Sequence, residues 1–290
     1  MKDTLFSSKL RFNTKGILRE FPNPIVMGIL NATPDSFYGD SRVNNLEAAL
    51  NKAEQMINEG ASIIDIGGYS SRPGAAEVSE KEEIKRTADL IAKIKSTHPE
   101  TLISIDTFRS KVAQEAINNG ADLINDISGG QLDPKIFDIA AQNKCPYILM
   151  HMRGTPETMM EMCQYDHLIN DIILYFSKQV RKAQNAGIMD IIIDPGFGFS
   201  KTLEQNYELL DQMNLLGVIG KPILAGVSRK SMIYRTLNSS PEESLNGTTA
   251  LNMVALQKGA RILRVHDVKA ASEAIILHQK LRANHEDAKT

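Results

Sequence analysis

Five short apolar runs in this chain, rich in β-branched residues, each end on one polar side chain that a hydrophobic core would exclude. The runs are 25–30 before Asn31, 63–64 before Asp65, 102–105 before Asp106, 123–124 before Asn125 and 191–193 before Asp194. A cluster of Gly, Pro, Ser or Thr usually follows, and then a stretch with helical periodicity. Runs that are apolar on both faces are typical of parallel strands covered by helices. Polar residues repeated at the carboxyl ends of buried strands predict a ring of site residues, and hence an enzyme.

Eight strand-then-helix units can be counted along the 290 residues. The strands are expected near 25–30, 62–67, 102–106, 122–125, 146–150, 190–194, 222–226 and 261–265. The helices are expected near 45–59, 79–97, 109–119, 134–143, 164–186, 203–216, 241–258 and 268–281. This pattern predicts an α/β protein, a single (β/α)8 TIM barrel in one domain over 1–290, since such barrels typically run ~250 residues. The barrel would cover about 25–281, and 1–24 would be a short N-terminal extension, a hairpin or lid over the barrel bottom.

The competing architecture is a doubly wound open sheet, which usually has fewer strands and a glycine-rich dinucleotide turn. Here the first strand runs into Asn-Ala-Thr-Pro-Asp at 31–35, which disfavours that sheet. Local signals support several helix boundaries. Gly60, Gly120 and Gly187 are expected to stop the helices before them, and Ser79 with Glu82 three residues later resembles a capping box.

Composition excludes several classes of protein. A formal net charge of -2 leaves no electrostatic footprint for nucleic acid, so an anionic ligand must be met by individually placed Arg and Lys. Cys145 and Cys163 could form one disulfide, but reduced thiols are favoured because a chain this long needs no covalent staple. The N-terminus lacks an apolar signal core, and no apolar run approaches the ~20 residues of a membrane span. We therefore expect a cytoplasmic protein.

Two connections, 31–44 and 67–78, are long and polar, contain Gly and Pro, and lack helical periodicity. Loops of this length in a compact fold are usually functional or mobile. Both leave the carboxyl end of a strand, and this is the face of a barrel on which active sites are built. We expect both loops to border the site.

Asp106, Asn125 and Asp194 would end the third, fourth and sixth strands and point into one cavity. Buried carboxylates and amides are costly without partners. The trio therefore favours a ligand rich in ring N–H donors with an adjacent acceptor, such as the edge of a purine, a pterin or a guanidine-like group. The alternative is that these side chains only cap the helices that follow.

Basic residues follow the last two strands. Lys230 would lie at the cavity rim or reach inside it, unless it is a solvated charge. Ser228 would stand at a helix start, where free N–H groups favour an anion. Arg264 and His266 share one face of the last strand because side chains alternate along a strand. Together they predict a phosphate clamp, and phosphate sites recur after the last two strands of this fold.

Two strand-end segments, 65–74 and 194–199, combine an aspartate with glycines. In the first, hydroxyl groups can donate hydrogen bonds and Arg72 can meet an anion, unless the segment is only an exposed turn. In the second, Phe197 or Phe199 is available as a wall beside a flat ring. The sequence has no Ser, His and Asp pattern of a hydrolase and no zinc-ligand spacing, so these chemistries are poorly supported.

Seven motifs in the same order resemble those of one family. They are Asn31-Ala-Thr-Pro-Asp-Ser-Phe37, Asp65-Ile-Gly-Gly-Tyr-Ser-Ser-Arg-Pro-Gly74, Ser104-Ile-Asp-Thr107, Ile124-Asn-Asp126, Asp194-Pro-Gly-Phe-Gly-Phe199, Gly226-Val-Ser-Arg-Lys230 and Arg264-Val-His-Asp267. The series closely resembles the dihydropteroate synthases of folate biosynthesis, the targets of sulfonamides. The resemblance runs from about residue 24 to the last helix.

The resemblance implies that 6-hydroxymethyl-7,8-dihydropterin diphosphate condenses with 4-aminobenzoate, giving 7,8-dihydropteroate and diphosphate. The pterin would be held by Asp106, Asn125, Met150, Asp194, Phe199, Gly226, Lys230 and Arg264. The aminobenzoate would be held by Phe37, Ser71, Arg72, Pro73, Phe199 and Ser228, with its carboxylate near the helix that Ser228 begins. The diphosphate would face Asn31, Arg72, Arg264 and His266, with Mg²⁺ bridging Asn31 and phosphate oxygens. Catalytic roles would fall to Asp35, Arg72, Lys230, Arg264 and His266.

The same resemblance favours loss of diphosphate before the amine attacks, which needs no enzyme nucleophile, and it implies a homodimer. Two departures from the family pattern are Ser71, where the family usually has Thr, and the sequence that begins at Tyr38 in the first loop. One alternative is a methyltetrahydrofolate-dependent corrinoid methyltransferase, which would share the pterin residues but has no use for a diphosphate clamp. The other is a catalytically silent pterin-binding protein, which predicts loss of metal or loop residues, yet Asn31, Asp35 and Arg72 are present.

Overall fold

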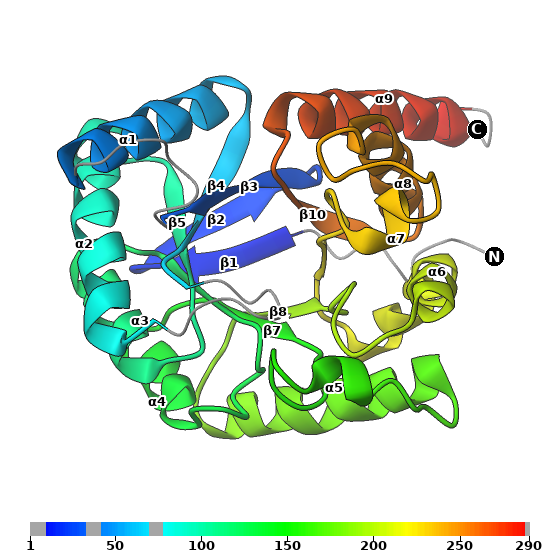
Figure 1. The fold of residues 1–290 in the computed structure, drawn as a ribbon, viewed down its shortest axis with the longest axis horizontal. Helices are drawn as coiled ribbons and strands as arrows, with labels where there is room; N and C mark the ends of the chain where they lie inside the picture. The colour runs from blue at the N-terminus through cyan, green and yellow to red at the C-terminus, as the bar shows by residue number, and fades with distance from the viewer. Residues whose placement is uncertain (1–9, 33–41, 70–77, 288–290) are drawn as a thin grey trace.

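The computed structural model describes residues 10–32, 42–69 and 78–287. Eight parallel strands close into a barrel in the order β10-β3-β4-β5-β6-β7-β8-β9, and the helices surround it (Figure 1). The barrel strands are β3 (Ile25–Asn31), β4 (Ala61–Gly67), β5 (Leu102–Asp106), β6 (Leu123–Asp126), β7 (Tyr147–Met150), β8 (Ile191–Asp194), β9 (Ile223–Ala225) and β10 (Ala260–Val265). The predicted (β/α)8 barrel is therefore confirmed, and each predicted strand lies within one residue of the observed one at either end.

The helices follow the strands in alternation. They are α1 (Arg42–Asn58), α2 (Glu80–Thr97), α3 (Ser110–Asn118), α4 (Lys135–Gln142), α5 (Leu168–Asn185), α6 (Leu203–Asp211), α7 (Ser231–Tyr234), α8 (Leu245–Gln257) and α9 (Val268–Asp287), with 3₁₀ segments η2 (Met159–Glu161) and η3 (Met213–Ile219). The predicted glycine stops are confirmed, since Gly60, Gly120 and Gly187 take φ values of 102°, 116° and 100°. None of the helices in the described ranges has the length and apolarity to cross a membrane.

Two helix predictions need correction. The helix expected over 203–216 ends at Asp211, and the chain continues as the 3₁₀ segment η3 to a left-handed Gly220. Ser79 caps α2 by accepting from the Glu82 backbone N–H, but the Glu82 carboxylate pairs with Arg86 Nε at 3.0 Å. A full capping box, with both reciprocal bonds, instead starts α6 at Thr202 and Gln205.

The interior of the barrel is built in layers, because alternate residues of each strand face inward. One apolar layer is made by Met27, Ile63, Leu102, Leu123, Ile148, Ile192, Leu224 and Ile262. Two residues further along their strands, the inward positions include Asp65, Asn125, Asp194 and Arg264. The barrel interior therefore changes from an apolar layer, the floor of the site, to a polar layer between one inward-facing residue of each of these strands and the next. The outward-facing side chains form a separate apolar core beneath the helices.

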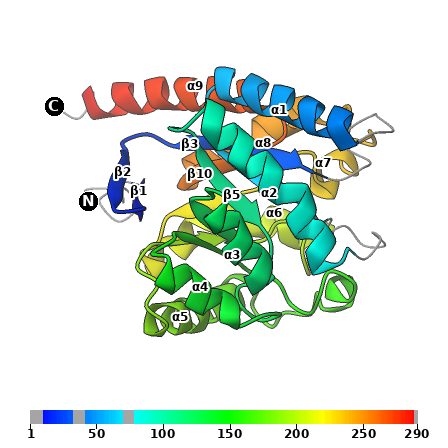
Figure 2. The same ribbon diagram turned by 90° about the vertical axis from the view of Figure 1, so that its left-hand side faces the viewer.

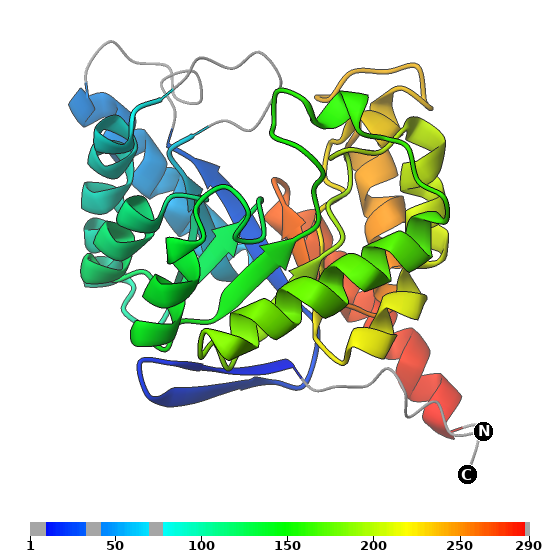
Figure 3. The same ribbon diagram turned by 90° about the horizontal axis from the view of Figure 1, so that it is seen from below.

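The N-terminal extension forms an antiparallel hairpin of β1 (Leu10–Thr14) and β2 (Ile17–Phe21). The hairpin covers the end of the barrel at which the strands begin (Figures 2 and 3). Leu10 and Phe12 are at most 1 % exposed and belong to the same cluster as the apolar floor. Asn13 N donates to Asp190 Oδ2 at 2.8 Å, and Arg261 donates to the Phe21 carbonyl at 2.9 Å. The expected cover over the barrel bottom is thus a hairpin that continues the core.

Candidate active site

Strand register brings the predicted polar residues to one end of the barrel. Asp106 lies opposite Asn125 across β5 and β6, and Asp194 lies opposite Met150 across β7 and β8. Arg264 enters the same layer from β10, which closes the barrel against β3. Four strands that are far apart in the sequence therefore contribute to one polar cluster, as predicted from their carboxyl-end residues.

Asp65 lies at the centre of this cluster. Its side chain is fully buried, and its Oδ2 accepts from Asn125 Nδ2 at 3.0 Å and from Arg264 Nε at 2.6 Å. Arg264 Nη2 donates in turn to Asp106 Oδ2 at 2.5 Å. The four side chains form one hydrogen-bonded network across β4, β5, β6 and β10. The sequence predicts Asp65 only as a strand-end residue, and the structure shows that it links Asn125 to Arg264.

Burial and charge decide the protonation of the network. Burial raises the pKa of Asp106 to about 7, against the opposing effect of the nearby Arg264 cation. Burial alone would lower the pKa of Arg264, but the carboxylates of Asp65 and Asp106 outweigh it and raise that pKa. The guanidinium therefore stays charged, whereas the Asp106 carboxyl changes its charge near neutral pH.

Asp194 and Lys230 form the opposite side of the cluster. Asp194 Oδ1 accepts from Gly196 N at 2.8 Å, and burial raises the pKa of this carboxyl despite the charge of Lys230. Lys230 Nζ donates to the Phe197 carbonyl and lies 4.8 Å from the centre of the Phe199 ring. Burial lowers the pKa of Lys230 to about 8. Lys230 thus reaches inside, and the alternative of a solvated charge is wrong.

An apolar wall adjoins the polar cluster. Ile127, Met150, Met152 and Met159 form a small buried group against which Phe108 and Phe199 pack. Of the two phenylalanines expected beside a flat ring, Phe197 is fully buried in the outer core, so only Phe199 can serve. The site therefore joins polar groups and a partly aromatic wall, the combination that a flat heteroaromatic ring with a hydrogen-bonding edge requires.

The residues after β9 and β10 are linked by side-chain contacts. Ser228 Oγ lies 3.0 Å from His266 Nδ1 and accepts from His266 N at 3.2 Å. Arg229 binds Asp267 through two hydrogen bonds of 2.8 Å. The expectation that Ser228 begins a helix is wrong, because α7 begins at Ser231, with Lys230 as its N-cap. Ser228 lies instead in the loop, buried next to His266.

Asn31 ends β3 beside the glycines of the next strand. A Cβ atom added at Gly67 would lie 3.6 Å from Asn31 Oδ1 and 3.7 Å from Asp106 Cβ, so the three residues are neighbours. Gly226, also predicted at the site, faces Arg264, because a Cβ atom added at Gly226 would lie 3.9 Å from the Cβ of Arg264. The described residues contain no group of three His, Cys, Asp or Glu side chains that could hold a metal ion.

Five predicted site residues lie outside the described residues. They are Asp35, Phe37, Ser71, Arg72 and Pro73, together with the departure at Tyr38. The structure therefore places the pterin residues and the basic residues after β9 and β10. The two loops expected to border the site are described only at their ends.

The chain matches the family model described as pterin binding enzyme over residues 27–266. The dihydropteroate synthase of Synechocystis sp. is 48% identical over 251 residues, which are 86% of this chain and 86% of that protein. The solved Yersinia pestis dihydropteroate synthase with a sulfonamide drug complex is 40% identical, with a TM-score of 0.88 over 94% of this chain and 100% of that one. The Xanthomonas albilineans dihydropteroate synthase with 4-aminobenzoic acid is 35% identical, with a TM-score of 0.88 over 95% and 99%.

Proposed function

Because the chain belongs to the pterin-binding enzyme family, we propose that its barrel carries out the reaction of the dihydropteroate synthases that it resembles. It condenses 6-hydroxymethyl-7,8-dihydropterin diphosphate with 4-aminobenzoate and releases diphosphate, which makes it a transferase. The product, 7,8-dihydropteroate, belongs to folate biosynthesis.

One observation carries this proposal, the set of acceptors at the polar end of the barrel. Asp106, Asn125 and Asp194 come from three strands, and each is a side chain that can accept from a ring N–H. Charged carboxylates make the stronger acceptors. A pterin has N–H donors and an acceptor carbonyl along one edge, and Phe199 with Met150 offers a flat apolar contact for its face. The carboxylates bind the ring donors, and Lys230 faces the ring carbonyl.

The diphosphate end of the substrate would meet Arg264 and His266. Arg264 is held by two carboxylates, so its guanidinium is fixed before the substrate arrives. We propose that the bond between the pterin methylene and the diphosphate oxygen breaks first, with the electron pair leaving on the diphosphate. The amine nitrogen then attacks the methylene and loses a proton. The cations of Arg264 and Lys230 stabilise the departing charge, and the mechanism uses no nucleophile from the protein.

Among the described residues, Asn31 is the one we propose as a ligand for Mg²⁺. Asn31 Oδ1 faces the space beside Gly67, and an amide oxygen is a suitable ligand for a hard cation. Mg²⁺ usually keeps several waters and binds substrate phosphates rather than a complete protein cage. We therefore propose that Asn31 holds Mg²⁺ together with the substrate diphosphate. When bound, the ion would neutralise charge on the leaving group.

The aminobenzoate would lie farther from the barrel floor than the pterin. Ser228 and Phe199 both belong to loops that follow strands, so they lie beyond the strand-end pterin residues. We propose that the Ser228 hydroxyl meets the carboxylate of 4-aminobenzoate and that the Phe199 ring contacts its aromatic face. Phe37, Ser71, Arg72 and Pro73 would complete this site from the loops outside the described residues.

The decisive assay measures diphosphate release from the purified protein with the pterin diphosphate, 4-aminobenzoate and Mg²⁺. We expect release that depends on 4-aminobenzoate, and formation of 7,8-dihydropteroate in equal amount. A second arm supplies methyltetrahydrofolate and a corrinoid acceptor, and we expect no methyl transfer. Binding of pterin without release of diphosphate would contradict the proposal and indicate a silent pterin-binding protein.

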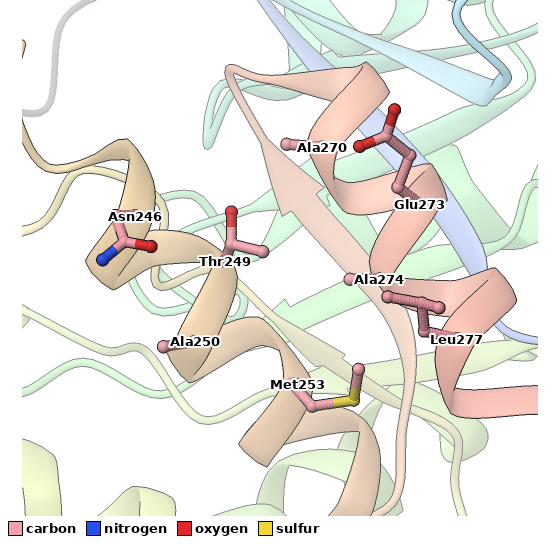
Figure 4. Close-up of a pocket in the computed structure, with 8 residues that line it drawn as sticks. All are labelled: Asn246, Thr249, Ala250, Met253, Ala270, Glu273, Ala274 and Leu277. Atoms are coloured by element: carbon pink, nitrogen blue, oxygen red, sulfur yellow. The ribbon is translucent and has the colours of Figure 1, made fainter. Parts of the chain in front are cut away.

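We also propose that the chain forms a homodimer through α8 and α9. One side of α9 packs on the barrel, while Ile276, Leu277 and Leu281 are 57 %, 60 % and 52 % exposed on the other. A hollow of about 300 Å³ lies between the two helices (Figure 4). Its lining is Asn246, Thr249, Ala250, Met253, Ala270, Glu273, Ala274 and Leu277. We propose a second copy as the occupant of this surface, since a two-fold interface uses the same patch of both subunits.

Sedimentation analysis tests the dimer. The wild-type protein should sediment as a dimer, and Leu277→Glu should shift it toward the monomer. A wild-type monomer at micromolar concentration would contradict this proposal. We also propose a cytoplasmic location, which the free thiols of Cys145 and Cys163 support, since disulfides are rare in a reducing compartment. Cell fractionation would check this placement.

A further inference from the structure

Lys201, which the proposed mechanism does not use, is a buried lysine directly behind the site, and burial lowers its pKa to about 7. It follows the 195–200 loop between β8 and α6, and its side chain is only 2 % exposed. Its Nζ lies 3.0 Å from His151 Nδ1, 3.0 Å from the Gly196 carbonyl and 3.0 Å from the Phe199 carbonyl. A buried ammonium is costly unless all its protons are hydrogen-bonded. These three acceptors match the three N–H groups of the lysine.

His151 serves here as an acceptor. It lies directly after β7, is 1 % exposed, and its ring is nearly perpendicular to that of Tyr175, with 4.7 Å between ring centres. Burial and the charge of Lys201 hold the pKa of His151 well below its usual value. The imidazole is therefore neutral, and its Nδ1 is placed to accept from Lys201 Nζ when the ring proton is on Nε2.

The carbonyls that Lys201 binds belong to a loop that also binds Lys230. Lys201 Nζ donates to the carbonyls of Gly196 and Phe199, and Lys230 Nζ donates to the intervening carbonyl of Phe197. The ring of Phe199 lies under the Lys230 ammonium at 4.8 Å. Two lysines therefore hydrogen-bond to the same short loop, one from the interior of the protein and one from the polar end of the barrel.

We propose that Lys201, oriented by His151, is a positioning residue that fixes the 195–200 loop so that the Phe197 carbonyl and the Phe199 ring hold Lys230 against the pterin. The inference rests on the proposed function, because it gives Lys230 its contact with the pterin. Lys201 itself acts through the loop and touches no substrate.

Lys201→Met tests this role, because methionine keeps a long unbranched side chain and removes the charge and the donors. Calorimetric titration with 6-hydroxymethylpterin should show binding about tenfold weaker than in the wild-type protein, the loss expected for one charge-assisted hydrogen bond. Lys258→Met is the matched control. Lys258 Nζ pairs with Asp211 at 2.7 Å on the outer surface, so pterin affinity should stay within about twofold of wild type.

A double-mutant cycle separates positioning from a merely structural role. If Lys201 acts through Lys230, then Lys201→Met with Lys230→Met should lose no more pterin affinity than Lys230→Met alone. Losses that add fully would overturn the inference, as would a Lys201→Met protein that melts at a lower temperature yet binds pterin like the wild type.

A second pair of variants decides the matter if Lys201→Met does not fold. His151→Leu removes the acceptor and should weaken pterin binding about tenfold, whereas His151→Asn keeps an acceptor near the Nδ1 position and should restore it. Equal pterin affinities in these two variants and the wild type would overturn the inference. The proposed function fails by a different result, the absence of diphosphate release from the wild-type protein.

Discussion

Asp65 is the residue whose replacement should reveal the network most clearly. Its Oδ2 serves two donors, Asn125 Nδ2 and Arg264 Nε, in a place with no exposed surface. Asp65→Asn can keep an oxygen at the Oδ2 position and turn its amide group toward the Oδ1 position. Oδ1 has no hydrogen-bond partner within the described ranges, so the new donors displace none of the bonds observed there. The substitution therefore removes the charge and leaves the shape.

The expected loss follows from the two bonds. Hydrogen bonds to charged groups contribute roughly 1.5–3 kcal/mol and neutral ones roughly 0.5–1.5. The bond from Asn125 becomes neutral and the bond from Arg264 loses one of its two charges, so the substitution costs about 2 kcal/mol. Asp65→Ala leaves both donors without that partner, at ~1–3 kcal/mol each. Since Arg264 keeps Asp106 at 2.5 Å, we expect a loss toward the middle of that range, about 3–4 kcal/mol in the free energy of unfolding. Urea denaturation with an unchanged m-value measures the stability losses of Asp65→Asn and Asp65→Ala.

Pterin affinity distinguishes the site from the scaffold. Asp65→Asn should weaken pterin binding by at least about tenfold, equal to ~1.4 kcal/mol, because Arg264 and Asn125 lose their fixed orientation. Asp122 is the matched control at the other end of the barrel, where its carboxylate binds Lys95 at 2.6 Å and accepts from Ile103 N at 2.9 Å. Asp122→Asn should cost comparable stability and leave pterin affinity unchanged. The reasoning is refuted if Asp65→Asn binds pterin like the wild type, or if both variants weaken binding equally.

Three further changes give sharp expectations. The value of kcat/KM for the pterin diphosphate should rise with pH as Asp106 ionises near pH 7 and fall as Lys230 loses its proton near pH 8. Lys230→Arg should abolish only the alkaline fall. A flat pH profile would contradict these assignments. Arg264→Lys should raise KM for the pterin diphosphate about tenfold or more in steady-state kinetics, because an ammonium cannot reproduce the fork that two carboxylates hold, and an unchanged KM would count against that geometry. Gly196→Ala should lower the free energy of unfolding in urea by about 2–5 kcal/mol, since the φ of Gly196 is 71° and the added Cβ would lie 2.1 Å from a main-chain carbonyl oxygen. Gly220→Ala is the control, because Gly220 has a φ of 67° but open space around it, and it should cost only about 1–2 kcal/mol. Equal losses at the two glycines would refute the steric argument.

Strand positions and inward-facing residues could be predicted because parallel buried strands follow a simple rule. Runs apolar on both faces marked the strands, and alternation then fixed which residues face the interior. Asp106, Asn125 and Asp194 lie where that rule puts them. The helix over 203–216 was mispredicted because apolar spacing continues past Asp211, although the chain has changed to a 3₁₀ path there.

The hydrogen-bonded partners could not be predicted, since they depend on how the barrel closes. Asp65 and Arg264 are 199 residues apart, and they meet because β10 pairs with β3, which lies beside β4. Lys201 and His151 are separated by 50 residues and by the whole of α5. Charge alone would have placed both Lys201 and Lys230 at the surface. Only the three-dimensional structure shows that both ammonium groups bind carbonyls of one loop.

The hairpin beneath the barrel has a consequence for the order of events in turnover. With Leu10 and Phe12 packed across the amino ends of the strands, the hairpin closes that end of the barrel, and Phe199 and Ser228 lie at the opposite end. A molecule bound between those two residues, as proposed for 4-aminobenzoate, stands in the path of anything deeper. In the proposed arrangement, the pterin diphosphate would therefore enter first and the aminobenzoate second. The joined product would then leave past the same two residues as a single molecule.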